Sequence, residues 1–326
     1  MNQINWGIIG CGNVTEKKSG PAFNKVPNSR LVAVMRRDAE KAADYARRHQ
    51  VPRWYSDATA LINDPEVNAI YIATPPSTHE LYTLQALAAG KPVYVEKPMC
   101  LDAAGARRMQ EAAGHSSSKL VIAHYRRSQP QFLKIKSLLE QGAIGQVYLV
   151  KMDLLQNQRD IVLAGDAENW RLNPSISGGG LFHDLAPHQL DLMQFYFGEV
   201  ANAHGIARKQ LSQNAAPDLV TGHILFKDGV IFNGNWCFSV GTPEEVDLCE
   251  IIGEYGSICF SVFSQSLTVT VNGEVTSHQF DPLPHVQQPM IEKVVDYFLG
   301  RGDNPASPEE AIVTMELLDT FTETIS

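Results

Sequence analysis

Short apolar runs alternate with helical stretches over the first 124 residues, and this alternation constrains the fold more than any other feature of the chain. Such alternation predicts an α/β domain with a parallel, doubly wound sheet and right-handed crossovers. The expected strands are Ile4–Ile9, Leu31–Met35, Ala69–Ala73, Pro92–Val95 and Leu120–Ala123, with a weaker one at Arg53–Tyr55. The expected helices between them are Asp38–His49, Thr78–Ala89 and Asp102–Ala113.

The pattern changes after one further expected helix, Gln129–Gln141. Turn signals such as Asn272-Gly273 separate consecutive strands, which indicates antiparallel hairpins and an α+β domain with a large open sheet. We therefore expect a first domain over residues 1–124 and a second over 125–326, with two C-terminal helices that pack on either one. The expected strands are Gly145–Leu155, Ala203–Leu211, Asp218–Lys227, Val230–Val240, Val246–Ile252, Ser257–Val262 and Leu267–Val271, and the helices are Leu181–Phe197, Met290–Leu299 and Ser307–Ile325.

Length and composition limit the classes of function that are expected for this chain. A chain of 326 residues exceeds a typical single core, so two domains are expected. The net charge of −9 offers no basic face for nucleic acid. No apolar run is long enough to span a membrane, and the first residues lack a secretory signal. The five cysteines include no C-x-x-C pair, which indicates free thiols and a cytoplasmic location.

A glycine loop follows the first expected strand. Gly10 permits a tight turn and Gly12 lets the backbone approach a pyrophosphate, which would meet the helix that begins at Asn13 and Val14. Thr15 stands where the full motif has a third glycine. Two glycines alone are a weak signal, but the position in the first βα turn favours dinucleotide binding.

The end of the second expected strand bears on the choice of nucleotide. An acidic residue there would bind the ribose 2′-hydroxyl of NAD, whereas this chain has Arg36 and Arg37. Guanidinium groups match the oxygens of a 2′-phosphate, so NADP is favoured and NAD stays possible. The alternative is a solvated arginine pair. Asp38 is interpreted as the N-cap of the next helix.

Two further strand ends carry polar residues. Strand ends of a parallel sheet point toward the ligand crevice, so Thr74, Pro75 and His79 are candidates for cofactor binding, as are Glu96 and Lys97. Each group also has a structural interpretation. The first could simply begin a helix, and the second could be a solvated ion pair before one.

One helix in the second domain carries a polar face. Asp184, His188 and Asp191 fall on it by their spacing, after a run of glycines at 178–180. A histidine beside a carboxylate suits acid–base chemistry near neutrality, although such a pair is often structural. Pro187 predicts an irregular first turn. A metal site built on His183, Asp184 and His188 is disfavoured because no acidic or cysteine cluster completes it, so no metal is expected.

Taken together, these motifs resemble the glucose–fructose oxidoreductase / inositol dehydrogenase (Gfo/Idh/MocA) family over nearly the whole chain. The resemblance implies a Rossmann domain, an open antiparallel sheet and hydride transfer to or from a nicotinamide. It further implies that Lys97 contacts substrate and nicotinamide ribose, that His188 is the acid–base group and that Asp184 orients it. The family often has glycine at Ala186 and an acid at Arg36. The motifs are Gly10-Cys11-Gly12, Thr74-Pro75 with His79, Ala89-Gly90-Lys91 before Glu96-Lys97-Pro98, and Gly178-Gly179-Gly180 before Asp184-x-x-x-His188-x-x-Asp191.

The leading hypothesis is an NADP-dependent oxidoreductase acting on a secondary alcohol or ketone carbon of a sugar, polyol or trans-diol. Tyr125, Arg126, Trp170 and Arg171 are candidates for the substrate pocket, and domain packing or surface charge explains them equally well. One alternative is a nucleotide-binding sensor without turnover; another is a glycosidase that uses bound nicotinamide transiently. The mixed outer face of the open sheet is either solvated or the interface of a homo-oligomer, a dimer or tetramer.

Overall fold

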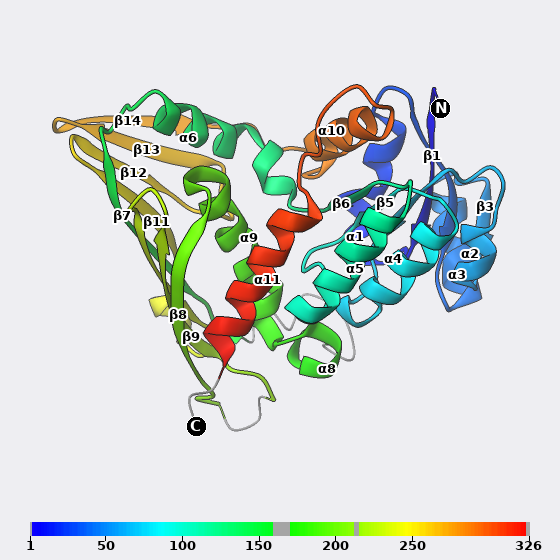
Figure 1. Cartoon of the computed structure of the whole chain (residues 1–326), viewed down its shortest axis with the longest axis horizontal. Coiled ribbons are helices and arrows are strands. Elements are labelled where there is room, and N and C mark those ends of the chain that lie inside the picture. The colour runs from blue at the N-terminus through cyan, green and yellow to red at the C-terminus, as the bar shows by residue number, and fades with distance from the viewer. Residues whose placement is uncertain (1, 159–169, 212–214, 324–326) are drawn as a thin grey trace. The chain divides into compact units, whose positions relative to one another are not determined.

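The computed structural model describes residues 2–158, 170–211 and 215–323. They form two compact units, one of Met1–Arg126 with Leu283–Ile312 and the other of Arg127–Pro282 with Val313–Ser326. Each unit contains one β-sheet, and Figure 1 shows the elements of both. Within the described ranges no helix has the length and apolarity that crossing a bilayer requires.

The sheet of the first unit has six parallel strands in the order β3-β2-β1-β4-β5-β6, which confirms the predicted doubly wound sheet. This order reverses direction between β1 and β4, and in such sheets ligands bind outside the carboxyl ends at that point. The strands are β1 (Ile4–Ile9), β2 (Ser29–Met35), β3 (Arg53–Tyr55), β4 (Ala69–Ile72), β5 (Val93–Val95) and β6 (Leu120–Ile122).

Aspartates begin three of the helices in this unit. Asp38, Asp57 and Asp102 are N-caps, and each side chain accepts a backbone N–H at 2.7–3.1 Å. An aspartate cap is worth about 1 kcal/mol, and the cap at Asp38 confirms its interpretation from the sequence. The helices are α1 (Asn13–Lys17), η1 (Gly20–Asn24), α2 (Ala39–Arg48), α3 (Ala58–Ile62), η2 (Pro76–Thr78), α4 (His79–Ala88), α5 (Ala103–His115), η3 (Tyr125–Ser128) and α10 (Gln288–Phe298).

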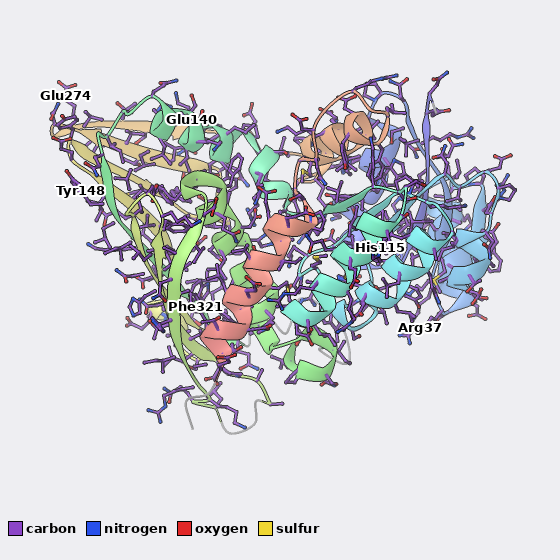
Figure 2. All side chains as sticks on the ribbon, viewed as in Figure 1. Arg37, His115, Glu140, Tyr148, Glu274 and Phe321 are labelled. Atoms are coloured by element: carbon purple, nitrogen blue, oxygen red, sulfur yellow. The ribbon has the colours of Figure 1, made fainter. Side chains whose placement is uncertain are left out.

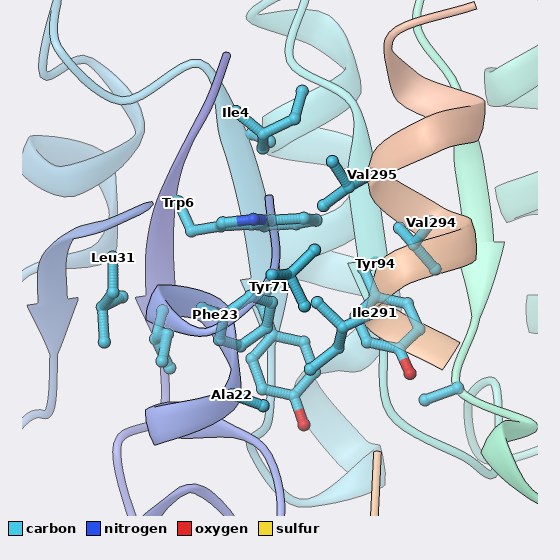
Figure 3. Close-up of a cluster of buried hydrophobic side chains, with 14 of the residues drawn as sticks. Ile4, Trp6, Ala22, Phe23, Leu31, Tyr71, Tyr94, Ile291, Val294 and Val295 are labelled. Carbon is cyan, nitrogen blue, oxygen red and sulfur yellow. The ribbon is translucent and has the colours of Figure 1, made fainter. Parts of the chain in front are cut away.

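An aromatic cluster forms the core on one face of this sheet. Trp6 lies 4.8 Å from Phe23, and Tyr71 stacks on Tyr94 at 5.2 Å, between ring centroids. Figure 3 shows Ile291, Val294 and Val295 of α10 directed at these rings. The sequence left the position of the C-terminal helices open; α10 packs in the first unit, and α11 (Pro308–Thr322) begins there and ends in the second.

The second unit has an eight-stranded sheet in the order β14-β13-β12-β11-β7-β10-β9-β8. The pairing is antiparallel as predicted except between β7 and β10, which run parallel; α9 and the strands β8 and β9 lie between them in the chain. The strands are β7 (Val147–Leu155), β8 (Val200–Arg208), β9 (Leu219–Phe226), β10 (Ile231–Cys237), β11 (Val246–Gly253), β12 (Gly256–Phe260), β13 (Ser266–Val271) and β14 (Glu274–Gln279). The remaining helices are α6 (Pro130–Glu140), η4 (Trp170–Leu172), α8 (Pro174–Ser177), α9 (Gly180–Phe197) and η5 (Thr242–Glu244).

The two faces of this sheet differ in burial. On β10, Phe232 and Trp236 are fully buried, and α6, α9 and the end of α11 lie on that side of the sheet (Figure 1). The other face exposes apolar side chains, including Ile206 at 59% and Leu248 at 45%. Tyr148, near the start of β7 and labelled in Figure 2, is 50% exposed.

Paired glycines let α11 approach the sheet closely. Gly205 and Gly222 are opposite each other on β8 and β9. A Cβ at Gly205 would lie 2.5 Å from the Cα of Phe321, and one at Gly222 would lie 2.2 Å from its ring. Glycine is therefore required at both positions for the ring of Phe321 to lie against the strands.

Candidate functional site

The glycine loop lies at the carboxyl end of β1. Gly10 has a φ of +95°, and a Cβ there would lie 2.8 Å from the backbone nitrogen of Thr74, so only glycine fits. Beside Gly12 there is open space, since the nearest atom to a Cβ would be the Gly10 oxygen at 3.9 Å. Cys11 points into the core, where burial raises the pKa of its thiol to about 11. The loop is therefore shaped for close approach of a ligand at Gly12.

Thr15, in place of a third glycine, is part of the turn that follows. Its hydroxyl donates to the Gly12 carbonyl at 2.8 Å, and its own carbonyl accepts from the Tyr45 hydroxyl at 2.8 Å. A Cβ at Gly20 would lie 2.2 Å from the Thr15 oxygen. Thr15 thus closes the turn that Asn13 and Val14 begin, and Gly20 permits the next segment to pack on it.

The arginine pair lies at the end of β2. Arg36 is half-buried, and its Nη1 donates to the carbonyl of Cys11 at 3.4 Å, so its guanidinium lies beside the glycine loop. Arg37 is exposed (Figure 2). The structure therefore separates two residues that the sequence treated alike.

His79 joins two strand ends of the same sheet. Its Nε2 lies 2.7 Å from the Thr74 carbonyl and its Nδ1 lies 2.9 Å from the Pro98 carbonyl. The ring is fully buried, and burial lowers its pKa while the two carbonyl oxygens oppose that shift. These contacts hold the segment at Thr74 and Pro75 against the segment after β5.

Glu96 and Lys97 follow β5, and the peptide bond from Lys97 to Pro98 is cis. The Glu96 side chain is buried, and its Oε1 accepts from the hydroxyl of Tyr71 at 2.5 Å and from Nε2 of Gln287 at 2.6 Å. Lys97 is half-buried. The glutamate is therefore directed into the unit and forms part of a buried polar network.

Tyr125 and Arg126 lie in η3, immediately after the last strand of the first unit. Both are at most 9% exposed, and the Arg126 guanidinium lies 5.7 Å from the centroid of the Tyr125 ring. Arg127 follows in the chain and belongs to the second unit. The two predicted pocket residues are thus a buried stacked pair at the end of the first unit.

The helix α9 carries the second set of predicted residues. It runs from Gly180 to Phe197 and includes Pro187, so the prediction that regular helix begins only near the proline was wrong, although Gly180 at its start has a φ of +74°. Burial on most sides holds the segment helical although Pro187 supplies no N–H to the carbonyl four residues earlier. The chain before the helix packs tightly against the ring of His183. A Cβ at Gly179 would lie 2.0 Å from Nδ1 of His183, so a side chain does not fit there.

Asp184 is held by a residue that the sequence placed in the substrate pocket. The Nε of Arg171 donates to Oδ2 of Asp184 at 2.9 Å, and its guanidinium lies 4.6 Å from the centroid of the Trp170 ring. The carboxylate is 16% exposed and the arginine 31%. Trp170, Arg171 and Asp184 therefore form one cluster at the start of α9.

His188 is buried, and its ring makes a T-shaped contact with the ring of Phe263, at 6.0 Å between centroids. Phe263 belongs to the turn between β12 and β13, and it is 38% exposed. Asp247 fixes this turn by accepting from the backbone N–H groups of Val262 at 3.2 Å and Phe263 at 2.9 Å, and from the Ser261 hydroxyl. Sequence inspection missed Phe263, because a lone exposed aromatic in a turn carries no signal.

Asp191, one turn further along α9, forms a buried ion pair with Arg127. Arg127 follows the predicted residues Tyr125 and Arg126 directly, but nothing in the sequence pairs it with Asp191 over 64 positions. Within the described residues, no group of three or more histidine, cysteine, aspartate or glutamate side chains could hold a metal ion.

The fold and these segments define a class of protein. A six-stranded parallel sheet in this order, with a two-glycine loop after its first strand, is a dinucleotide-binding Rossmann unit. The sequence profile described as an oxidoreductase family with NAD-binding Rossmann fold matches residues 4–124. The profile of the GFO/IDH/MocA C-terminal domain matches residues 132–259.

Relatives agree with these matches. "Oxidoreductase P35" of Formosa agariphila is 50% identical over 320 residues and covers 98% of both chains. A 1,5-anhydro-D-fructose reductase of Ensifer adhaerens is 27% identical over 78% of this chain and 74% of its own. Levoglucosan dehydrogenase, solved in complex with NADH and levoglucosan, has the same fold with a TM-score of 0.86, at 21% identity over 99% of this chain and 97% of its own. The chain belongs to the Gfo/Idh/MocA family of oxidoreductases.

Proposed function

We propose that this protein is an NADP(H)-dependent oxidoreductase that transfers a hydride between nicotinamide and a secondary alcohol or ketone carbon of a sugar, polyol or trans-diol. One observation carries the proposal. Glu96 and Lys97 follow β5, in the same sheet and at the same edge as the glycine loop after β1. Relatives named for 1,5-anhydro-D-fructose and levoglucosan support a carbohydrate-like substrate.

The cofactor would be held by the first unit. The open space beside Gly12 fits a pyrophosphate, and the guanidinium beside the loop, Arg36, fits a 2′-phosphate. When bound, the cofactor supplies the hydride acceptor or donor. Thr74 and Pro75 would line the nicotinamide side, and His79 would act indirectly by holding their segment. We thus propose that residues 1–124 bind the dinucleotide and that residues 125–326 supply substrate contacts and an oligomer interface.

Three side chains would serve the reaction itself. Lys97 would donate a hydrogen bond to the alkoxide or carbonyl oxygen and stabilise its developing charge. His188 would take the hydroxyl proton in oxidation and return it in reduction. Asp184, fixed by Arg171, would keep the histidine in a productive orientation. Tyr125, Arg126 and Trp170 are proposed as substrate neighbours.

The exposed sheet face supports a homo-oligomer. Leu225, Ile231 and Leu149 are adjacent on β9, β10 and β7 and face outward, with the first two 43% and 46% exposed. An apolar row of this length on a sheet is more typical of an interface than of a solvated surface. The proposed partner is a second copy of the chain in a dimer or tetramer. A cytoplasmic location is proposed from the cysteine pattern.

A substrate panel tests the proposal directly. Aldoses, ketoses, inositols, vicinal diols, 1,5-anhydro-D-fructose and levoglucosan are each incubated with either dinucleotide while the absorbance of the reduced ring is followed. Lys97→Ala and His188→Ala are each expected to lower turnover at least about 10²-fold while the affinity for NADPH changes little. Lys41→Ala and His115→Ala, both exposed in the first unit, are the matched controls.

The outcomes separate the alternatives. Tight NADPH binding with no turnover of any compound in the panel would favour a sensor. Glycoside cleavage without net consumption of NADP⁺ would favour a glycosidase. Wild-type turnover in either Lys97→Ala or His188→Ala would remove that residue from the proposed chemistry.

A further inference from the structure

Gln287 is a fully buried glutamine before the first turn of α10, and no motif of the chain includes it. Its backbone N–H donates to the Lys18 carbonyl at 3.2 Å. Its side chain meets two residues of β5 and the segment after it: Nε2 donates to Glu96 Oε1 at 2.6 Å, and Oε1 accepts from the Tyr94 hydroxyl at 3.2 Å. A residue 191 positions away in the chain thus contacts the Glu96-Lys97-Pro98 motif.

Tyr94 fixes which end of the amide faces Glu96. Burial raises the pKa of Tyr94 well above its ordinary value, so its phenol stays protonated and donates. The Gln287 oxygen accepts that hydrogen bond, and the NH₂ group is left pointing at the carboxylate. Figure 3 shows the hydroxyl groups of Tyr71 and Tyr94 pointing toward the same end of the cluster.

Glu96 receives a second donor from the sheet itself. The hydroxyl of Tyr71, on the neighbouring strand β4, donates to the same Oε1 at 2.5 Å and lies 3.1 Å from Ser19 Oγ. Burial, with the Glu96 charge adding to it, raises the pKa of Tyr71 well above its ordinary value. Two donors, one from β4 and one from the residue before α10, therefore hold one oxygen of the buried Glu96 carboxylate.

The backbone transmits this constraint to Lys97. The N–H of Glu96 donates to the Ile72 carbonyl at 2.9 Å, which continues the ladder between β4 and β5, so successive side chains there point to opposite sides. On the other flank, the Pro98 carbonyl is held by His79 at 2.9 Å. Lys97 therefore lies between two residues, Glu96 and Pro98, that are each held by hydrogen bonds.

We propose that Gln287 is a positioning residue that, through Glu96, sets the direction of the Lys97 side chain. This proposal rests on the role of Lys97 in the proposed function.

Gln287→Leu removes the donor while keeping most of the side-chain volume. The turnover number is expected to fall about ten- to a hundredfold, because a small displacement of a catalytic group is enough for a loss of this size, with the KM for NADPH unchanged within about twofold. Tyr94→Phe, which leaves the amide free to turn, is expected to give a smaller loss of the same kind. Tyr94→Phe replaces Gln287→Leu as the test if Gln287→Leu folds poorly.

Gln287→Glu supplies a readout that a structural role would not produce. It places two carboxyl groups in hydrogen-bond contact, and such a pair shares a proton until the pH rises above its upper apparent pKa. While the proton is present, the new carboxyl can donate as the amide does. The activity relative to wild type is therefore expected to recover as the pH falls from about 8.5 to about 5.5, a trend absent from Gln287→Leu.

The position of Lys97 can also be measured without a substrate. Trace acetylation with acetic anhydride, followed by mass spectrometry, is expected to show a change of about threefold or more in the labelling rate of Lys97 in Gln287→Leu, with Lys119 and Lys136 unchanged. Val294→Ala is the control, since it removes buried methyl groups from the same helix two turns away. It should lower the melting temperature while leaving turnover and the labelling of Lys97 as in wild type.

Two results would overturn the proposal: Gln287→Leu that lowers only the melting temperature, or Gln287→Glu with the pH profile of wild type. If Lys97→Ala itself turns over normally, the proposed function of Lys97 fails instead. In that case the labelling rate alone decides whether Gln287 positions the lysine.

Discussion

Arg127 and Asp191 form an ion pair inside the second unit, with the side chains only 4% and 2% exposed. The Nε of Arg127 donates to both carboxylate oxygens at 2.9 and 3.0 Å, and its Nη2 lies 2.8 Å from Oδ1. The guanidinium also lies 5.4 Å from the centroid of the Phe195 ring. Asp191 shares a helix face with Asp184 and His188, and the ion pair joins that face to the beginning of the second unit.

Breaking this pair on one side should destabilise the second unit. Asp191→Leu or Arg127→Met is expected to lower the free energy of unfolding by about 3–5 kcal/mol, because an unpaired charge is left in the interior. The double variant Arg127→Met/Asp191→Leu should lose less than either single change. Urea unfolding of all three proteins measures the coupling, and additive losses would contradict it.

The position of Arg36 beside the glycine loop predicts its part in cofactor choice. Arg36→Ala is expected to weaken NADPH binding about ten- to a hundredfold and leave NADH binding nearly unchanged, because the charge-assisted bonds to the 2′-phosphate are lost. Arg37→Ala, at the exposed neighbour, is the control and should change either affinity by less than about threefold. Fluorescence titration of the reduced dinucleotides gives both ratios. An equal loss for NADH and NADPH in Arg36→Ala would contradict NADP preference.

His183 predicts how stability depends on pH. Burial lowers the pKa of this histidine to about 4, so the folded chain keeps the ring neutral while the unfolded chain protonates it near its ordinary pKa of about 6.5. Stability is therefore lost as the pH falls from about 6.5 toward 4, by up to about 3 kcal/mol. His183→Leu should flatten that part of the profile, and His223→Gln, at an exposed position, should not. Urea unfolding at a series of pH values gives the difference between variant and wild type; identical slopes would refute the assignment.

The contact between Arg171 and Asp184 predicts a kinetic effect. Arg171→Met removes the partner of a carboxylate that is proposed to orient His188, so turnover is expected to fall about tenfold and the pH profile of turnover to shift. Trp170→Leu, which removes only the stacked ring, should change the KM for substrate more than turnover. Steady-state kinetics over a pH range distinguishes the two. Arg171→Met with wild-type turnover would mean that the ion pair is structural only.

Strands and helices whose limits depend on the local hydrophobic pattern could be predicted from the sequence. The range Ile4–Ile9 is exact, and the cap at Asp38 follows from hydrogen bonding within one turn. The edge strand β14 was missed because Glu274–Gln279 is polar and mostly exposed, so it has no buried alternation to reveal it. The parallel pairing of β7 with β10 was also missed, since strand order depends on contacts far apart in the chain.

The site shows the same division between local and distant information. Motifs located Glu96 and Asp184, because their spacing in the chain carries the signal. They could not locate Gln287, Arg127 or Arg171 as partners of the motif residues, since these pairings form only when distant segments meet. Likewise, the sequence gives no reason to choose Arg36 over Arg37 as the residue near the cofactor. The fold shows that Arg36 lies beside Cys11.

The Phe263 turn gives the last prediction. An aromatic ring that is 38% exposed and meets the ring of His188 offers an apolar surface next to the proposed acid–base group. Such a surface suits the CH face of a sugar or cyclic diol. Phe263→Ala is therefore expected to raise the KM for substrate about two- to tenfold, the equivalent of about 0.5–1.5 kcal/mol, without changing NADPH affinity.

Asp247 tests whether the rigidity of the turn matters. Asp247→Ala removes the acceptor of two backbone N–H groups and of the Ser261 hydroxyl, so the ring of Phe263 would no longer be held in one place. Its KM for substrate should rise as in Phe263→Ala although the aromatic ring is still present. Tyr148→Ala, at a 50% exposed aromatic near the start of β7, is the control. If Phe263→Ala and Tyr148→Ala have the same kinetic constants, Phe263 is a surface residue without a part in substrate binding.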